Sequence, residues 1–211
     1  MGERARDAVR ERVIDGRYPQ GARIVEREVA EELEMSRVPV REALRALVTE
    51  GLLELLPHSG VRVRRLRRSD VEQLYEVWEP LAVQASRLAA RRVAAYAPQE
   101  PPGLDALRTA LRHADAAAAD GGGKPEVTAN IGFHRHIVTL SGNGLLERTM
   151  EPLVWQLRLL FGLNTEPQPM RDQHHRMLAD IASGDEETAA ACTLLHVRDS
   201  RIAALRSLPE A

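Results

Sequence analysis

The chain has 211 residues, a formal net charge of −2 and a hydrophobic fraction of 44%, which suits one or two globular domains with cores built mostly from leucine, valine and alanine. The single cysteine, Cys192, excludes an intrachain disulfide framework. The sequence also shows neither an apolar signal core nor a run of about 18 apolar residues, so we expect a soluble cytoplasmic protein and no membrane partner.

Charge is distributed unevenly along the chain. Residues 1–68 carry 15 Lys and Arg against 12 Asp and Glu, a net charge of +3, whereas residues 69–211 carry 14 against 19, a net charge of −5. This asymmetry indicates that only the first part contacts a polyanion. Because the excess is small, the placement of the arginines matters more than their number.

Apolar spacing in the first third predicts two helices joined by a turn. The first helix ends near Gly16, and the turn follows at residues 18–21. The second helix covers residues 26–34, with its apolar side chains inward and many glutamates outward. We expect this glutamate-rich helix to cross a DNA backbone only where its acids point away from the phosphates.

A third helix is predicted directly after Met35. Ser36 suits its N-cap, Pro39 is tolerated in its first turn, and Gly51 is a suitable C′ residue. The helix carries an apolar stripe and a separate arginine stripe, formed by Val40, Leu44, Leu47 and Val48 and by Arg37, Arg41 and Arg45. Such a helix suits the major groove of DNA, where guanidiniums pair with guanine or phosphate. Taken alone, the stretch also fits an ordinary surface helix with solvated arginines.

The residues after this helix predict a β-hairpin. Two short apolar strands, at residues 52–56 and 60–64, flank a turn at residues 57–59. Three helices followed by a hairpin form a winged helix-turn-helix, which we place at residues 1–66. The basic run at residues 62–68 then either lies along DNA phosphates or forms a solvated connector.

This first domain resembles the DNA-binding domain of GntR-family transcription regulators. The residues that carry the resemblance are Gly16, Pro19, Gln20, Gly21, Ile24, Glu26, Val29, Ala30, the run from Ser36 to Leu44, Leu47, and Glu50 to Leu52. The resemblance implies DNA contacts by Ser36, Arg37, Val38 and Arg41 at the start of the recognition helix. It also implies contacts by Arg27 on the preceding helix and by Gly60 at the tip of the wing. Arg45, one turn further on, is expected at a phosphate or in solvent, and His58 is interpreted as a turn residue.

Residues 67–211 contain no strand signal and predict an all-α bundle of six helices. Three histidines, His134, His175 and His196, fall on the inward faces of three different helices in this reading. Asn130 lies one turn before His134 and points the same way. Neutral imidazoles that converge in a polar cavity are a common way to hold Zn²⁺ or a similar ion. The alternative for each of them is a hydrogen-bonded core histidine, and the sequence alone leaves the two readings even.

The second domain resembles the FCD ligand-binding domain of FadR-type GntR regulators. The matching stretches are residues 130–137 with 141–143, residues 175–185, and His196. Many such domains bind a divalent metal through one acid and three histidines. The resemblance therefore implies His134, His175 and His196 as ligands of Zn, Ni or Mn, with the uncharged Asn130 in the acid position. A small rotation of the helix would put His174 in place of His175. Trp78 stands where the family often has arginine, which suggests a more apolar pocket.

Together these features predict a homodimeric, effector-responsive transcription regulator. Each reader domain would bind one half of a pseudo-palindromic double-stranded operator, and a small carboxylate effector would complete the metal shell. We expect effector binding to release the DNA, so the protein would be a repressor. The alternatives are the same regulator with a metal-free pocket, a purely architectural DNA-binding protein, and a metal-dependent hydrolase fused to a DNA-binding module. An enzyme is not expected, because the sequence contains neither a His-Glu-x-x-His motif nor a positioned general base.

Overall fold

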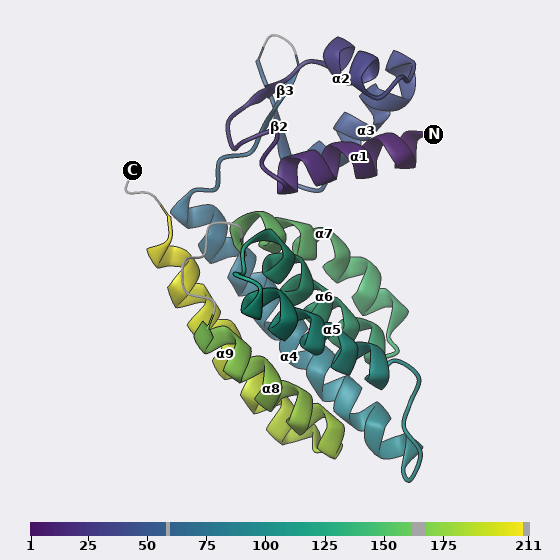
Figure 1. Cartoon of the computed structure of the whole chain (residues 1–211), viewed down its shortest axis with the longest axis vertical. Helices are drawn as coiled ribbons and strands as arrows, with labels where there is room; N and C mark the ends of the chain where they lie inside the picture. Colours follow the sequence, from purple (N-terminus) through teal and green to yellow (C-terminus); the bar gives the residue numbers. More distant parts are fainter. Residues whose placement is uncertain (58–59, 162–167, 209–211) are drawn as a thin grey trace. The chain divides into compact units, whose positions relative to one another are not determined.

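The computed structural model describes residues 1–57, 60–161 and 168–208. Contacts divide the chain into two compact units, Met1–Arg67 and Arg68–Ala211 (Figure 1). The fold class is the predicted one: mainly α, with a small sheet in the first unit and, over residues 68–161 and 168–208, helices alone in the second. No helix within the described ranges is both long and apolar enough to cross a membrane.

The first unit is a winged helix-turn-helix. Its elements are α1 (Gly2–Ile14), β1 (Arg23–Ile24), α2 (Glu26–Glu32), α3 (Arg37–Thr49), β2 (Leu53–Leu55) and β3 (Val61–Val63). α1 and α2 pack against α3, and their shared core includes the fully buried side chains of Val9, Val40 and Leu47. The predicted hairpin is present as the antiparallel pair β2–β3.

Two local features of this unit differ from the sequence prediction. A third strand, β1, pairs antiparallel with β3, so the sheet order is β1-β3-β2. Two residues are too few to show the alternating pattern that predicts a strand. Helix α2 ends at Glu32 and not at residue 34, because Glu34 has a left-handed backbone with φ of 53°.

Helix α3 starts where the sequence predicts, but the expected capping hydrogen bond is missing. Ser36 is the N-cap residue and has extended backbone angles, yet its side chain makes no capping hydrogen bond. A capping hydroxyl usually accepts from the amide of N2 or N3. Here N3 is Pro39, which has no N–H, so one of the two usual donors is missing.

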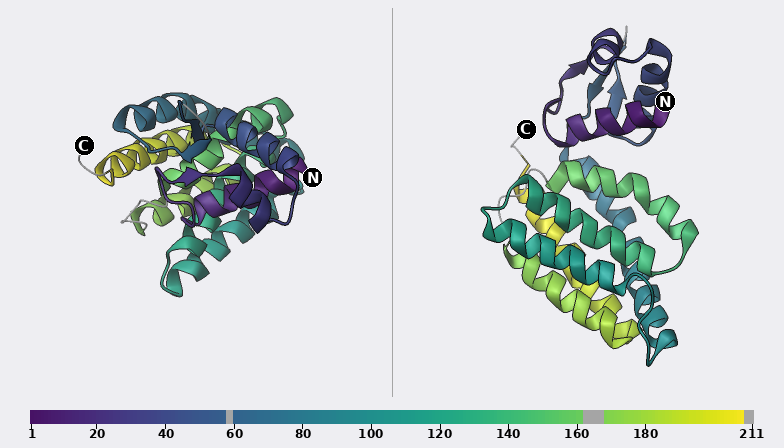
Figure 2. Two further views of the ribbon diagram at one scale, coloured as in Figure 1. Left: turned by 90° about the horizontal axis from the view of Figure 1, so that it is seen from above. Right: turned by 45° about the vertical axis from the view of Figure 1, so that its right-hand side comes forward.

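The second unit is a six-helix bundle across the residues that are described. Its helices are α4 (Arg68–Tyr96), α5 (Leu104–Ala119), α6 (Lys124–Leu140), α7 (Gly144–Phe161), α8 (Gln168–Ser183) and α9 (Glu186–Arg206). The long α4 contacts α6, α7, α8 and α9, while α5 packs on α6 and α8. Figure 2 shows the same helices in two further orientations.

Helices α4 and α9 lie antiparallel along much of their length, and buried polar pairs fix their register. The Tyr75 hydroxyl lies 2.7 Å from Ser200 Oγ, and Thr193 Oγ1 donates to Ser86 Oγ at 2.7 Å. Both pairs are buried between the helices. Because Thr193 and Ser200 flank His196 on the inward face of α9, this register directs His196 into the bundle.

Candidate functional site

Helix α3 exposes the face that the sequence predicts for DNA. Arg37, Arg41 and Arg45 are all exposed, and Val38 is 62% exposed beside them. The opposite face is buried, as expected from the apolar stripe. The guanidiniums of the three arginines can pair with guanine or phosphate, and the aliphatic side chain of Val38 can contact a thymine methyl.

The carboxylate of Glu26, the first residue of α2, binds two of these arginines. Arg41 donates from Nε to Glu26 Oε2 at 2.8 Å and from Nη2 to Oε1 at 2.9 Å. Arg37 donates from Nε to Glu26 Oε1 at 3.0 Å. The hydrogen bonds from Arg41, followed by those from Arg37, lower the pKa of Glu26 below its ordinary value. The carboxylate of Glu26 thus lies against the arginines of α3, and the expectation that α2 crosses a DNA backbone only where its acids point away stays a prediction.

The remaining predicted DNA contacts are exposed around this face. Ser36 is exposed, and Arg27 is exposed on α2 and pairs with Glu31 at 3.4 Å. Gly60, at the start of the returning wing strand, has a left-handed φ of 84°, which favours glycine. His58 and Ser59 lie outside the described residues. DNA contact by the predicted residues stays a prediction.

In the second unit, three buried histidines converge from three helices. His134 on α6, His174 on α8 and His196 on α9 offer ring nitrogens that all lie within 4.8 Å of one another. Their exposed fractions are 6%, 0% and 3%. Adjacent ring centroids are 4.6 to 5.2 Å apart. We refer to these three residues as the histidine cluster.

The cluster contains His174 where the sequence prediction places His175. His175 is exposed on α8, and its Nε2 lies 3.2 Å from Asp115 Oδ1 on α5. The buried stripe of α8 is Met170, His174, Met177 and Ile181, whereas the prediction followed Leu178 and Ala182, which are only half-buried. The assignment of His175 was thus wrong by one position around the helix, and the rotation considered from the sequence is the arrangement found.

Burial keeps the three imidazoles neutral. Removal from water lowers the pKa of His134 and of His174 well below the ordinary value, and nearby His196 adds to both effects. The same burial lowers the pKa of His196 to about 4. At neutral pH each ring therefore has one nitrogen with a free lone pair, which is the form that binds metal ions.

Gln173 and Asp199 set the tautomer of His196. The carboxylate of Asp199 can only accept, so the amide nitrogen of Gln173 donates to it, at 2.6 Å. The Gln173 Oε1 atom then faces His196 Nδ1 at 2.9 Å and accepts its proton. This leaves the lone pair of His196 on Nε2, which faces the cluster. Such outer hydrogen bonds orient the histidine ligands of metal sites.

Several polar atoms on α6 and α8 are buried without a hydrogen-bond partner among the described residues. Two of them are Nδ1 of His174 and Oδ1 of Asn130, which lies one turn before His134 on α6. The rings of Trp78 and Phe133 pack edge-on against His134, with centroids 6.2 and 5.7 Å away. Three neutral imidazoles beside an amide oxygen form a donor set that fits Zn²⁺, Ni²⁺ or Mn²⁺.

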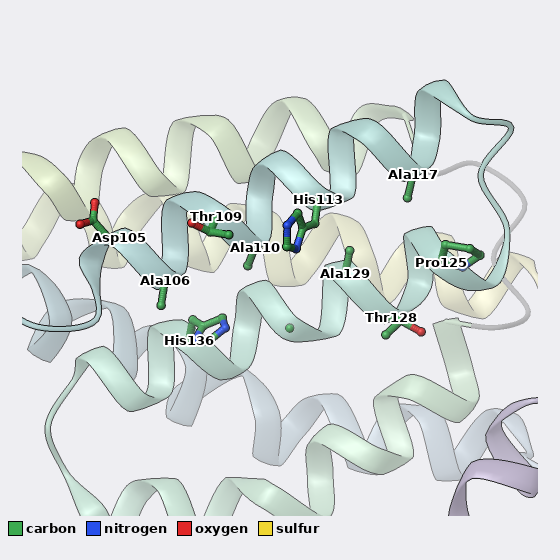
Figure 3. Close-up of a pocket in the computed structure, with 11 residues that line it drawn as sticks. Asp105, Ala106, Thr109, Ala110, His113, Ala117, Pro125, Thr128, Ala129 and His136 are labelled. Carbon is green, nitrogen blue, oxygen red and sulfur yellow. The ribbon is translucent and has the colours of Figure 1, made fainter.

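A separate open groove of about 850 Å³ runs between α5 and α6 (Figure 3). Small residues such as Ala106, Ala110 and Gly132 line most of it, together with His113 and His136. None of the cluster residues lines this groove. The convergent donor groups expected of a metal-dependent effector site are therefore in the cluster and not in the groove.

Both units match known families. Residues 1–63 match the bacterial regulatory proteins of the gntR family, and residues 73–199 match the FCD domain. A winged helix-turn-helix followed by such a domain defines a DNA-binding transcription regulator. The chain belongs to the gntR family in its form with an FCD domain. This confirms the family resemblance and places the chain among transcription regulators, not enzymes.

Two relatives with named roles agree with this assignment. A probable D-xylose utilization operon transcriptional repressor from Paenarthrobacter nicotinovorans is 30% identical over 201 residues, which cover 93% of this chain and 85% of that protein. The Nta operon transcriptional regulator of Aminobacter aminovorans is 31% identical, covering 86% and 83%.

Two solved structures show the same fold. A GntR-type transcriptional regulator from Rhodococcus sp. RHA1 matches with a TM-score of 0.80 at 24% identity, covering 97% of each chain. Escherichia coli McbR/YncC matches with a TM-score of 0.81 at 22% identity, covering 97% of this chain and 96% of that one. At these identities the match bears on the fold alone.

Proposed function

We propose that this regulator is a homodimeric repressor whose histidine cluster binds a small carboxylate effector through a divalent metal. The observation that carries the proposal is the convergence of His134, His174 and His196, buried and neutral, inside the FCD domain. Each reader domain binds one half of a pseudo-palindromic operator, because a two-fold symmetric protein presents two equivalent recognition helices. As a DNA-binding regulator it acts in the cytoplasm.

The donor set supports a metal-assisted effector site. His134, His174 and His196 would hold the ion through nitrogen, and Asn130 would add an uncharged oxygen. When bound, the metal would supply a Lewis-acidic positive charge. Because none of these ligands is anionic, that charge is not neutralised by the protein. An anionic oxygen ligand such as a carboxylate is therefore the effector chemistry that suits the site.

We propose that the protein represses transcription and that effector binding releases it from the operator. An effector acts only if it binds one arrangement of the two reader domains more tightly than another. An effector that orders the bundle and changes the spacing of the half-sites weakens operator binding. The relative from Paenarthrobacter nicotinovorans is itself named a repressor.

Metal analysis of the purified protein tests the site. Untagged protein is soaked in Zn²⁺, Ni²⁺ or Mn²⁺, dialysed and measured by elemental analysis, with thermal unfolding in parallel. We expect about one ion per chain for the parent. The variants His134→Ala and His174→Ala should lose the ion and the metal-induced thermal shift.

His175→Ala is the matched control, because His175 neighbours His174 in sequence but lies outside the cluster. It should bind metal like the parent. If the parent binds no ion but small carboxylates still raise its melting temperature, the metal-free pocket replaces this proposal. If His175→Ala alone abolishes binding, the ligand set is wrong.

A further inference from the structure

We infer that Glu26 is a specificity-determining residue, because it holds the guanidinium of Arg41 in the orientation that reads a guanine. The inference rests on the proposed docking of α3 in a major groove. Glu26 belongs to α2 and is only 21% exposed at its side chain, whereas the two arginines that it binds are 49% and 63% exposed. It lies beneath the arginine face and supports it.

The contact between Glu26 and Arg41 is bidentate. The two carboxylate oxygens accept from Nε and Nη2 of the same guanidinium, at 2.8 and 2.9 Å. Two parallel hydrogen bonds fix both the position and the plane of a guanidinium, which a single bond does not. The Arg41 side chain is therefore ordered before any DNA arrives.

The bidentate contact uses one edge of the guanidinium and leaves another available. The side edge, Nε with Nη2, is occupied by Glu26, while the end edge, Nη1 with the second proton of Nη2, has no partner among the described residues. A guanine presents two acceptors, O6 and N7, in the major groove, and they match a fork of two N–H groups. The free end of Arg41 has this geometry.

Arg37 differs from Arg41 in its attachment. It donates to Glu26 through Nε alone, at 3.0 Å, so its guanidinium plane can turn about that bond. A side chain with this freedom suits a phosphate, where a point charge suffices, better than a base edge. The geometry thus divides the two arginines into a fixed reader, Arg41, and an adaptable one, Arg37.

A carboxylate at this place affects specificity and affinity in opposite directions. Its negative charge opposes the phosphates, so it weakens binding to every duplex. Its hydrogen bonds fix Arg41, so they strengthen discrimination at one base pair. A contact that only restrained the arginines until DNA displaced it would instead weaken all binding and leave discrimination unchanged. These two roles are separable by experiment.

The test uses the full-length protein and a duplex selected by it from a random pool. Each guanine of the half-site is replaced in turn by 7-deazaguanine, which lacks the N7 acceptor. The parent should lose affinity roughly 5- to 150-fold at one guanine. Glu26→Ala should lose most of that discrimination, bind random duplex at least as tightly as the parent, and show a salt slope steeper by about 1.

Glu26→Gln keeps the shape of the side chain and should fall between the parent and Glu26→Ala. Glu31→Gln is the matched control, because Glu31 lies on the same helix and pairs with an arginine outside α3, Arg27. It should keep the parental discrimination. Parental discrimination in both Glu26 variants would overturn the inference, and tighter binding to all duplexes with unchanged discrimination would show an inhibitory contact instead. If the parent protein selects no duplex, the proposed docking of α3 in a major groove is itself wrong.

Discussion

The Nε2 atoms of His174 and His196 lie 3.3 Å apart, and only one of the two can carry a proton in this contact. Since Gln173 holds the proton of His196 on Nδ1, the bond is donated by His174 Nε2. The other nitrogen of His174, Nδ1, is then a buried acceptor without a partner among the described residues. A bound metal would compete with this hydrogen bond for the lone pair of His196 Nε2.

The buried neutral histidines predict that the second unit loses stability in mild acid. Their pKa values are lowered in the folded state, so between the folded pKa and about 6.5 the unfolded chain binds more protons. Their contribution is fully present above about pH 6.5 and is lost progressively as the pH falls through the lowered pKa values of the folded state. Each histidine changes the free energy of unfolding by at most about 1.4 kcal/mol per pH unit. The three together change it by at most about 4 kcal/mol per pH unit.

Chemical unfolding of metal-free protein between pH 7.5 and pH 4.5 measures this slope. The variant His196→Ala should show a shallower slope, because it removes one of the three buried imidazoles. A free energy of unfolding that does not change with pH across this range would contradict the burial of three neutral imidazoles.

Gln173→Leu should weaken metal binding while the bundle stays folded. The change removes the acceptor that keeps the proton of His196 on Nδ1, and loss of such an outer hydrogen bond reduces metal affinity about 10- to 100-fold. Competition with a chromophoric chelator measures the affinity. Asp172→Asn, at the neighbouring exposed position, is the control and should leave it unchanged. Equal affinities for Gln173→Leu and the parent would show that Gln173 does not tune the cluster.

Arg41→Ala and Arg45→Ala should weaken DNA binding in different ways. Loss of a base contact by Arg41 should cost about 1–3 kcal/mol on the preferred duplex and relax the preference at one base pair. Loss of a phosphate contact by Arg45 should weaken all duplexes alike and reduce the salt slope by about 1. Titrations of specific and random duplexes at several salt concentrations separate the two. A uniform loss for Arg41→Ala would remove its role as a base reader.

Thr193→Val should destabilise the second unit without changing the cluster. The substitution leaves Ser86 Oγ buried without its donor between α4 and α9, which should cost about 1–3 kcal/mol. Thr188→Val would remove an exposed contact with Asp185 and should have a smaller effect. Denaturant unfolding compares the two variants, and an equal loss of stability would mean that the buried pair contributes no more than the exposed one.

The main elements of the first unit could be predicted because local signals coincide there. The apolar stripe and the arginine stripe of α3 are both periodic, and Gly51 marks its end. The strand β1 was missed because two residues carry no period. The hydrogen bonds of Glu26 could not be predicted, because they join residues 11 and 15 positions apart whose geometry depends on the turn between α2 and α3.

The helical period predicted two of the three histidines in the cluster. His134 and His196 were assigned to inward faces, and both are buried. In α8 the adjacent histidines lie only one position apart, and two apolar stripes compete for the inward face. Burial of Met170, Met177 and Ile181 decides for His174. Sequence spacing alone does not resolve a rotation of one residue, because packing against the neighbouring helices sets it.

Selection of DNA from a random duplex pool tests the central claim most directly. The full-length protein, with and without added Zn²⁺, is used to enrich duplexes at moderate salt, and Arg41→Ala is carried through the same rounds. The account predicts that the parent enriches a two-fold symmetric sequence with a fixed half-site spacing, and that Arg41→Ala loses the preference at one base pair in each half. Enrichment of no sequence by the folded parent would contradict it.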